Sequence, residues 1–132
     1  MAGRIAYYGN IVLNGLILDL DAAKKDSYPG SGNNWYDISG NNNHFTLYNG
    51  VGFNSDKGGY LTFDGTNDYA VSNNNINLSS YSYVVIELFY ICNNTTSQTM
   101  IYEHTNNWNS NTGGFGLAVN SDGGGKDRKS TR

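Results

Sequence analysis

One tryptophan of this sequence lies in an unusually polar run. Trp108 is surrounded by asparagine and serine in the stretch Asn-Asn-Trp-Asn-Ser-Asn at residues 106–111. An exposed indole can stack on the apolar face of a sugar ring, while neighbouring amides form hydrogen bonds with the sugar hydroxyls. The run therefore predicts a carbohydrate site, and a loop tryptophan packed over the end of the fold is the open alternative. The candidate ligand-binding residues are Trp108, Asn106, Asn107, Asn109 and Asn111.

A second candidate is the acidic stretch at residues 64–68, which reads Asp-Gly-Thr-Asn-Asp. The side chains of Asp64, Asn67 and Asp68 offer hard oxygen ligands of the kind that Ca²⁺ takes. The stretch lacks the bidentate glutamate and the ligand spacing of an EF-hand loop. The alternative is a tight turn in which Asp64 and Asp68 accept hydrogen bonds from nearby backbone N–H groups. The sequence favours the turn, and calcium is the one cofactor that it leaves open.

Paired carboxylates suitable for glycoside hydrolysis are the next chemistry to consider. Such enzymes need two carboxyl groups about 5–9 Å apart, which acids at i and i+2 or i+4 of one strand could supply. Glu87 has no acidic neighbour within four residues, and Glu103 stands alone near the end of its predicted strand. Asp19 and Asp21 have the required spacing. The residues around them decide whether they form a catalytic pair or belong to a structural turn.

Metal-dependent and nucleophilic catalysis have no better support. The two histidines, His44 and His104, are isolated, and no second His or Cys stands at a zinc-binding spacing. We expect both histidines at the surface. The single cysteine, Cys92, follows an apolar run, which is typical of a buried structural thiol. These patterns predict a binding or structural protein and not an enzyme.

The composition indicates what kind of fold must position these residues. The 132 residues include 21 asparagines, 17 glycines and 11 tyrosines, but one proline and two glutamates. Asn and Gly are poor helix formers that enter left-handed turns readily, and Tyr suits half-buried positions in a sheet. A chain of this length forms one domain and needs no disulfide to bury a core. We therefore expect many short strands joined by Asn/Gly turns.

Charge and hydropathy exclude other classes. Of the net charge of −3, residues 126–132 carry four basic groups and one acid, which leaves −6 on residues 1–125. An acidic body argues against nucleic-acid binding by the fold itself. The basic tail is expected to be a solvated terminus, with contact to an acidic partner as the alternative. No apolar stretch approaches the roughly 20 residues of a membrane helix, and the start lacks the apolar core of a signal peptide.

Alternating hydrophobicity predicts the strands themselves. Asn49-Gly50 between two apolar runs predicts a hairpin turn. Leu61 and Phe63 are expected to point inward, and residues 83–91, apolar on both faces, are expected to form a covered central strand. The nine expected strands are residues 4–8, 11–20, 44–48, 51–53, 60–63, 69–71, 83–91, 99–103 and 115–119. Together they predict an all-β fold, a two-layer antiparallel β-sandwich.

Several blocks occur in an order that matches a known family. The blocks are Ile11–Asp21 with Ala22, Ser27–Gly32, Trp35–Asn41 with Asn43, Phe63–Tyr69, and Ser82–Tyr90 with its central Glu87. This string resembles the laminin-G-like, concanavalin-A-like lectin/glucanase modules that are common in bacteriophage structural proteins, over roughly residues 4–120. The resemblance implies a concanavalin-like jelly roll, with Trp35 in the core and Asp19 and Asp21 at a structural turn. Related modules also bind calcium at a sheet rim.

The sequence departs from that family at its end. Family members continue through further strands, whereas this chain reaches Gly123–Gly125 and a basic tail. The expected organisation is an N-terminal strand or docking segment at 1–10, the sandwich at 11–122 and the tail at 123–132. Because an incomplete sandwich exposes sheet edges, we expect association with copies of itself or with other virion proteins.

Two functions of different classes follow from the resemblance. The first is a non-enzymatic attachment module of a virion that recognises carbohydrate at a host surface. The second is a decoration or cement protein of a capsid or tail that has no glycan ligand. In both cases the protein is expected to be made in the host cytoplasm and carried in the virion, without membrane insertion.

Overall fold

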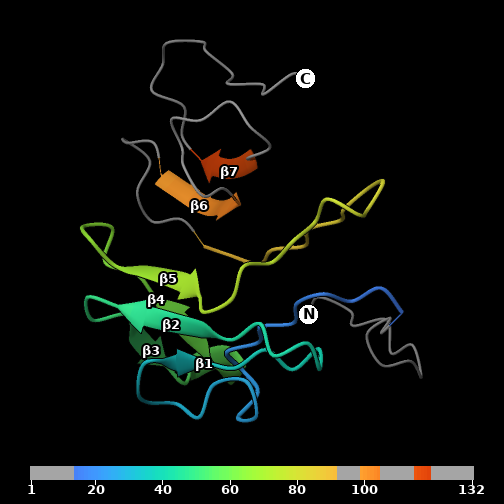
Figure 1. Cartoon of the computed structure of the whole chain (residues 1–132). Coiled ribbons are helices and arrows are strands. Elements are labelled where there is room, and N and C mark those ends of the chain that lie inside the picture. Colours follow the sequence, from blue (N-terminus) through green and yellow to red (C-terminus); the bar gives the residue numbers. More distant parts are fainter. Residues whose placement is uncertain (1–13, 92–98, 105–114, 120–132) are drawn as a thin grey trace, which may run out of the picture. The chain divides into compact units, whose positions relative to one another are not determined.

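The computed structural model describes residues 14–91, 99–104 and 115–119 (Figure 1). Within these ranges the regular structure is essentially all β, with seven short strands and one 3-10 turn, η1 (Asp56–Gly58). All strand pairs are antiparallel and the sheets are small. The all-β prediction is therefore confirmed, whereas the two-layer jelly roll stays a prediction. In the described part of the chain, no helix has the length and hydrophobicity needed to cross a membrane.

The chain divides into two compact units, Met1–Val84 and Val85–Arg132. The first contains a three-stranded sheet in the order β1-β2-β5 and a two-stranded sheet of β3 and β4. In the larger sheet Leu47 pairs with Ala70 and Tyr48 with Tyr69, whose rings stack with centroids 4.9 Å apart. The strands are β1 (Asn34–Trp35), β2 (Phe45–Tyr48), β3 (Gly52–Asn54), β4 (Tyr60–Thr62) and β5 (Tyr69–Ser72).

Few hydrophobic side chains in the described part of this unit are buried. Among the described residues, Leu47 and Tyr28 are the buried hydrophobic side chains, each 3% exposed. The Tyr28 ring packs on Phe53 of β3 at 5.3 Å between centroids, and its hydroxyl donates to the Gly32 carbonyl at 2.9 Å. Trp35, expected in the core, is only half-buried. With so little apolar burial, the polar contacts of the loops carry much of the packing.

The turn at Asn49-Gly50 has the predicted conformation but not the predicted partners. Both residues have positive φ, 65° and 101°, as a tight hairpin turn requires. However, β2 is already paired on both sides, with β1 and β5, so β3 pairs with β4 instead. The expected hairpin between residues 44–48 and 51–53 is therefore wrong, and the turn passes the chain from one sheet to the other.

Residues 16–20 were also expected in a strand, and they lie in no sheet. One backbone bond joins this segment to the loop at 37–43, from the Ile38 N–H to the Asp19 carbonyl at 2.9 Å. Its other bonds are made by side chains of that loop. The strand prediction is wrong because side chains of the 37–43 loop, and not the backbone of a neighbouring strand, form most of the hydrogen bonds to this segment. The prediction that Phe63 points inward is also wrong, since it is 48% exposed, whereas Leu61 is half-buried.

The second unit contains the hairpin of β6 (Thr99–His104) and β7 (Phe115–Val119), orange and red in Figure 1. Both strands agree with their predictions, and the pairing has an irregularity between Met100 and Tyr102. Burial raises the pKa of Tyr102, which packs against Phe115 at 5.8 Å between ring centroids. His104 stacks on Phe115 at 5.4 Å and is half-buried, so its expected surface position is wrong.

Residues 83–91, expected as a covered central strand, belong to no described sheet. The predicted alternation is nevertheless present within the second unit. Ile86, Leu88 and Tyr90 line an apolar hollow of about 290 Å³ together with residues of the β6–β7 hairpin. Val85 and Phe89 point the other way and are 84% and 91% exposed. The alternation thus predicted which side chains line the hollow, but residues 83–91 pair with no strand in the described part of the chain.

Candidate binding site

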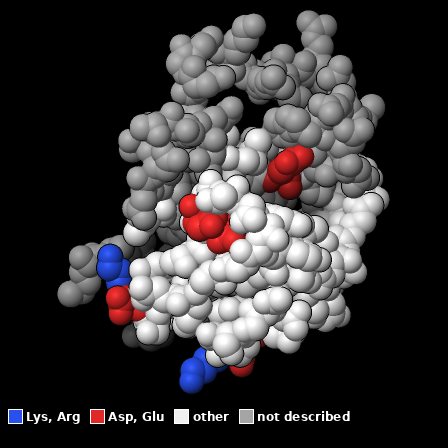
Figure 2. All heavy atoms as spheres, turned by 90° about the vertical axis from the view of Figure 1, so that its left-hand side faces the viewer, with Lys and Arg blue, Asp and Glu red and all other residues white. Residues whose placement is uncertain are grey.

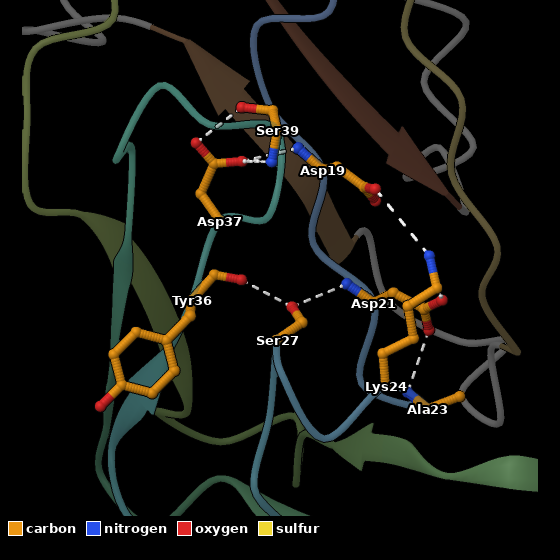
Figure 3. Close-up of polar contacts among 8 residues, drawn as sticks. All are labelled: Asp19, Asp21, Ala23, Lys24, Ser27, Tyr36, Asp37 and Ser39. Carbon is orange, nitrogen blue, oxygen red and sulfur yellow. Dashed lines mark hydrogen bonds and ion pairs between the residues drawn. The ribbon is translucent and has the colours of Figure 1, made fainter. Parts of the chain in front are cut away.

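The loop at residues 37–43 is organised by one carboxylate. Asp37 is 6% exposed. Its Oδ1 accepts the N–H groups of Asp19 and Ser39, and its Oδ2 accepts the Ser39 hydroxyl, all at 2.9 Å (Figure 3). The Asn43 N–H also donates to Oδ2 at 2.9 Å. Burial opposes ionisation, but these four donors outweigh it and lower the pKa of Asp37 below its usual 3.8. Asp37 is therefore charged at neutral pH.

A buried serine fastens the neighbouring loop. Ser27 is fully buried, and its hydroxyl donates to the Tyr36 carbonyl at 2.6 Å while accepting the Asp21 N–H at 3.0 Å (Figure 3). The side chains of Asp21 and Asp19 lie 3.6 and 4.0 Å from Lys24 Nζ. Exposed ion pairs of this kind contribute little stability. Asp19 and Asp21, the two acids whose sequence spacing would suit glycoside hydrolysis, thus both lie beside Lys24.

Two asparagines of the 37–43 loop hold the extended segment at residues 16–17. Asn41 Nδ2 donates to the Leu16 carbonyl at 2.8 Å, and Asn43 Nδ2 donates to the Ile17 carbonyl at 3.0 Å. Because a carbonyl can only accept, the amide nitrogens face this backbone and each Oδ1 is directed away from it. Within the described ranges, no hydrogen bond is donated to either Oδ1.

A third segment, residues 73–77, is tied to the same loop. The Asn73 N–H donates to the His44 carbonyl at 2.8 Å, and Asn73 Oδ1 accepts the Thr46 hydroxyl at 2.7 Å. Asn74 Nδ2 reaches the Asn42 carbonyl at 2.8 Å. These three bonds hold Asn73 and Asn74 against the loop and the start of β2, directly before the residues that line the hollow.

Residues 15–17, 39–43 and 75–81 border a polar hollow of about 470 Å³ in the first unit, which is open to solvent. Its amide and hydroxyl groups can donate and accept hydrogen bonds, and the half-exposed ring of Tyr81 offers a flat apolar surface. None of the described residues lining it is Asp, Glu, Lys or Arg. The lining residues are Gly15, Leu16, Ile17, Ser39, Asn41, Asn43, Asn75, Ile76, Asn77 and Tyr81.

His44 lies behind this loop and not at the surface as expected. It is half-buried, and its Nδ1 accepts the Asp37 N–H at 3.0 Å. The Tyr36 ring meets its imidazole edge-on at 5.3 Å between centroids. The histidine is thus a structural acceptor that supports the start of β2.

The acidic stretch at residues 64–68 adopts the turn that the sequence favoured. Asp64 Oδ1 accepts the Thr66 N–H at 2.7 Å and the Asn67 N–H at 3.4 Å, and Asp68 Oδ2 accepts the Asp64 N–H at 3.0 Å. The bond from Thr66 is the main cause that lowers the pKa of Asp64. In the described ranges no three His, Cys, Asp or Glu side chains lie together as metal ligands. Calcium at this turn stays a prediction.

The predicted carbohydrate residues lie outside the described ranges. Trp108 and its asparagine neighbours fall in 105–114, and the structure adds nothing to that prediction. The hollow in the first unit was missed by sequence reasoning. The available signal was the repeated spacing of two in Asn41/Asn43 and Asn75/Asn77, which among 21 asparagines did not stand out.

On the face shown in Figure 2, most described atoms belong to uncharged residues and charged side chains are few. This agrees with a charged fraction of 14% for the whole sequence. Comparison with protein-family models, with curated proteins and with solved structures gave no match. The chemistry of the hollow must therefore be interpreted from its own groups.

Proposed function

We propose that this chain is a non-catalytic module that binds carbohydrate at a host surface as part of a virion. The observation that carries the proposal is the asparagine-lined hollow beside Tyr81. Its volume of about 470 Å³ lies within the range of small-molecule sites. Amides that both donate and accept suit sugar hydroxyls, and an aromatic ring suits the apolar face of a pyranose.

The resemblance to laminin-G-like modules of bacteriophage proteins supplies the rest of this proposal. It supports a jelly-roll fold, to which the small antiparallel sheets would contribute, and it supports a place on the virion surface. The hydrogen bonds that hold Asn41 and Asn43 add a physical argument, because groups that are ordered before binding lose less entropy when a ligand arrives.

The replacement Tyr81→Ala tests the site. We expect about a tenfold loss of affinity for whichever glycan the full chain binds on a glycan array, because a stacking contact of about 1.4 kcal/mol disappears. Tyr60→Ala is the matched control, since Tyr60 is similarly exposed but lies on β4, outside the lining of the hollow. Affinity that falls with Trp108→Ala and not with Tyr81→Ala would move the site to residues 106–111. A full chain that binds no glycan would refute the function.

The alternative function, a decoration or cement protein, is favoured by a separate observation. Val85, Phe89 and Ile91 alternate along the chain with the residues that line the apolar hollow, and they are 84%, 91% and 78% exposed. Apolar side chains exposed together are typical of surfaces that other proteins cover. In this role we assign the surface to a second copy of the chain.

Sedimentation velocity tests the alternative. If copies associate through this face, Phe89→Asp weakens the association by at least tenfold, because burial of a phenylalanine contributes about 2 kcal/mol. Phe63→Asp introduces the same charge at an exposed phenylalanine of the first unit and is expected to leave association unchanged. A wild-type chain that sediments as a monomer at micromolar concentration contradicts the assignment of this face to a second copy.

A further inference from the structure

We infer that the hollow selects uncharged saccharides and discriminates against sugars that carry a carboxylate, sulfate or phosphate group. This inference rests on the proposed carbohydrate function and adds the class of ligand. It follows from three properties of the hollow: two amide oxygens held as acceptors, a buried negative charge behind the wall, and the lack of a cation among the described lining residues.

The first property is the fixed direction of two amides. Asn41 and Asn43 each use Nδ2 to hold a backbone carbonyl at residues 16–17, at 2.8 and 3.0 Å. Turning either amide over would place its oxygen against a carbonyl oxygen, and turning Asn41 over would also leave the Leu16 carbonyl without a donor among the described residues. Each Oδ1 therefore stays an acceptor, which a hydroxyl can satisfy as donor and an anionic oxygen cannot.

The second property is the charge of Asp37. Its carboxylate accepts the Ser39 hydroxyl at 2.9 Å, and Ser39 itself lines the hollow. Four donors keep this carboxylate ionised, so a negative charge stands directly behind the wall. A charge held away from water acts over several ångströms with little screening by salt.

The third property is the lining, in which no described residue is Lys or Arg. An anionic ligand would lose water without gaining an ion pair, which is unfavourable. A neutral pyranose loses only hydroxyl hydration, which the amides replace. Asn75 and Asn77 are exposed, so their side chains can adjust to such a ligand.

Isothermal titration with matched sugars tests the selectivity. The full chain is titrated with cellopentaose, maltopentaose and β-1,4-galactopentaose, and with the same sugars after their C6 hydroxymethyl groups are oxidised to carboxylates. The neutral form of whichever sugar binds is expected to bind at least tenfold more tightly. Equal or tighter binding of an oxidised sugar, or of sialyllactose alone, overturns the selectivity and leaves the carbohydrate function standing. Binding of none of these sugars counts against both.

A charge placed on the rim tests the cause. Asn75→Lys is expected to reduce the preference for the neutral form by at least tenfold at low salt, whereas Asn75→Gln keeps it. Asn75 is exposed, so neither change disturbs packing, and circular dichroism checks that the fold is retained. A preference that is the same in both variants would show that charge at the hollow does not set it.

Discussion

Replacing Asp37 with alanine is expected to lower the free energy of unfolding by about 3 kcal/mol. The carboxylate accepts three backbone N–H groups and one hydroxyl, and it is almost fully buried. Alanine leaves those donors without a partner in a place where water replaces the acceptor only in part. The effect exceeds that of an ordinary surface substitution because one side chain joins residue 19 to both ends of the 39–43 loop.

Urea denaturation followed by tryptophan fluorescence measures this loss. The protein has two tryptophans, so a Trp108→Phe background makes Trp35, on β1 of the first unit, the only reporter. Asp26→Ala is the matched control, because Asp26 is exposed and makes no hydrogen bond to the described residues; its cost is expected to stay within about 0.5 kcal/mol. A similar midpoint for both variants would mean that the Asp37 network contributes little.

The same network predicts a pH dependence. The pKa of Asp37 is lowered in the folded state relative to its ordinary value of 3.8. Its contribution is therefore fully present above pH 3.8 and is lost as the pH falls through the lower folded pKa. Asp64, whose pKa is also lowered, adds a slope of the same sign in both proteins. Wild-type stability is thus expected to fall more steeply below pH 4 than that of Asp37→Ala, in urea titrations at each pH.

Hydrophobic alternation and turn residues predicted most of the strands. They failed where the structure depends on which distant segments pair with each other. Residues 45–48, 60–62 and 69–72 alternate as strands do, and they form β2, β4 and β5. The Asn49-Gly50 pair specified a turn through its own φ angles. It could not specify which strands would pair with β2. That pairing depends on β1 and β5, which occupy both edges of β2.

The candidate site was harder to predict, for a related reason. Asn41, Asn43, Asn75 and Asn77 each look like loop residues in a chain that has 21 asparagines. What brings them together is a set of side-chain bonds between segments more than 20 residues apart, such as Asn74 Nδ2 to the Asn42 carbonyl. Hydrophobic periodicity carries no information about such bonds.

The segment at residues 16–20 has the hydrophobic pattern of a strand but does not pair with another strand that the structure describes. Its apolar alternation predicts a strand, but all five residues are half-buried and none is in a strand. Asp37 and Asn43 nevertheless take the place of a neighbouring strand, by bonding Asp19 and Ile17. A side chain that accepts or donates like a backbone group ends a ladder without changing the hydrophobic pattern.

A second large effect is expected at Gly59, which joins η1 to β4. Its φ of 115° and ψ of 135° lie in a region that residues with a Cβ rarely adopt. An added Cβ would also lie 3.0 Å from Phe53 Cζ and 3.1 Å from the Ala22 carbonyl oxygen. Phe53 cannot withdraw freely, because its ring packs on the buried Tyr28. Gly59→Ala is therefore expected to destabilise the first unit by about 3 kcal/mol.

Gly65→Ala separates the two causes of this loss. Gly65 also has a positive φ, 75°, but an added Cβ would meet nothing within 4 Å. Backbone strain alone should then cost about 1 kcal/mol, and the difference between the two variants measures the contact with Phe53 and Ala22. In the same Trp35-only denaturation, a Gly59→Ala midpoint as high as that of Gly65→Ala would mean that these contacts relax. In that case Phe53 can move away from the added Cβ although its ring packs on Tyr28.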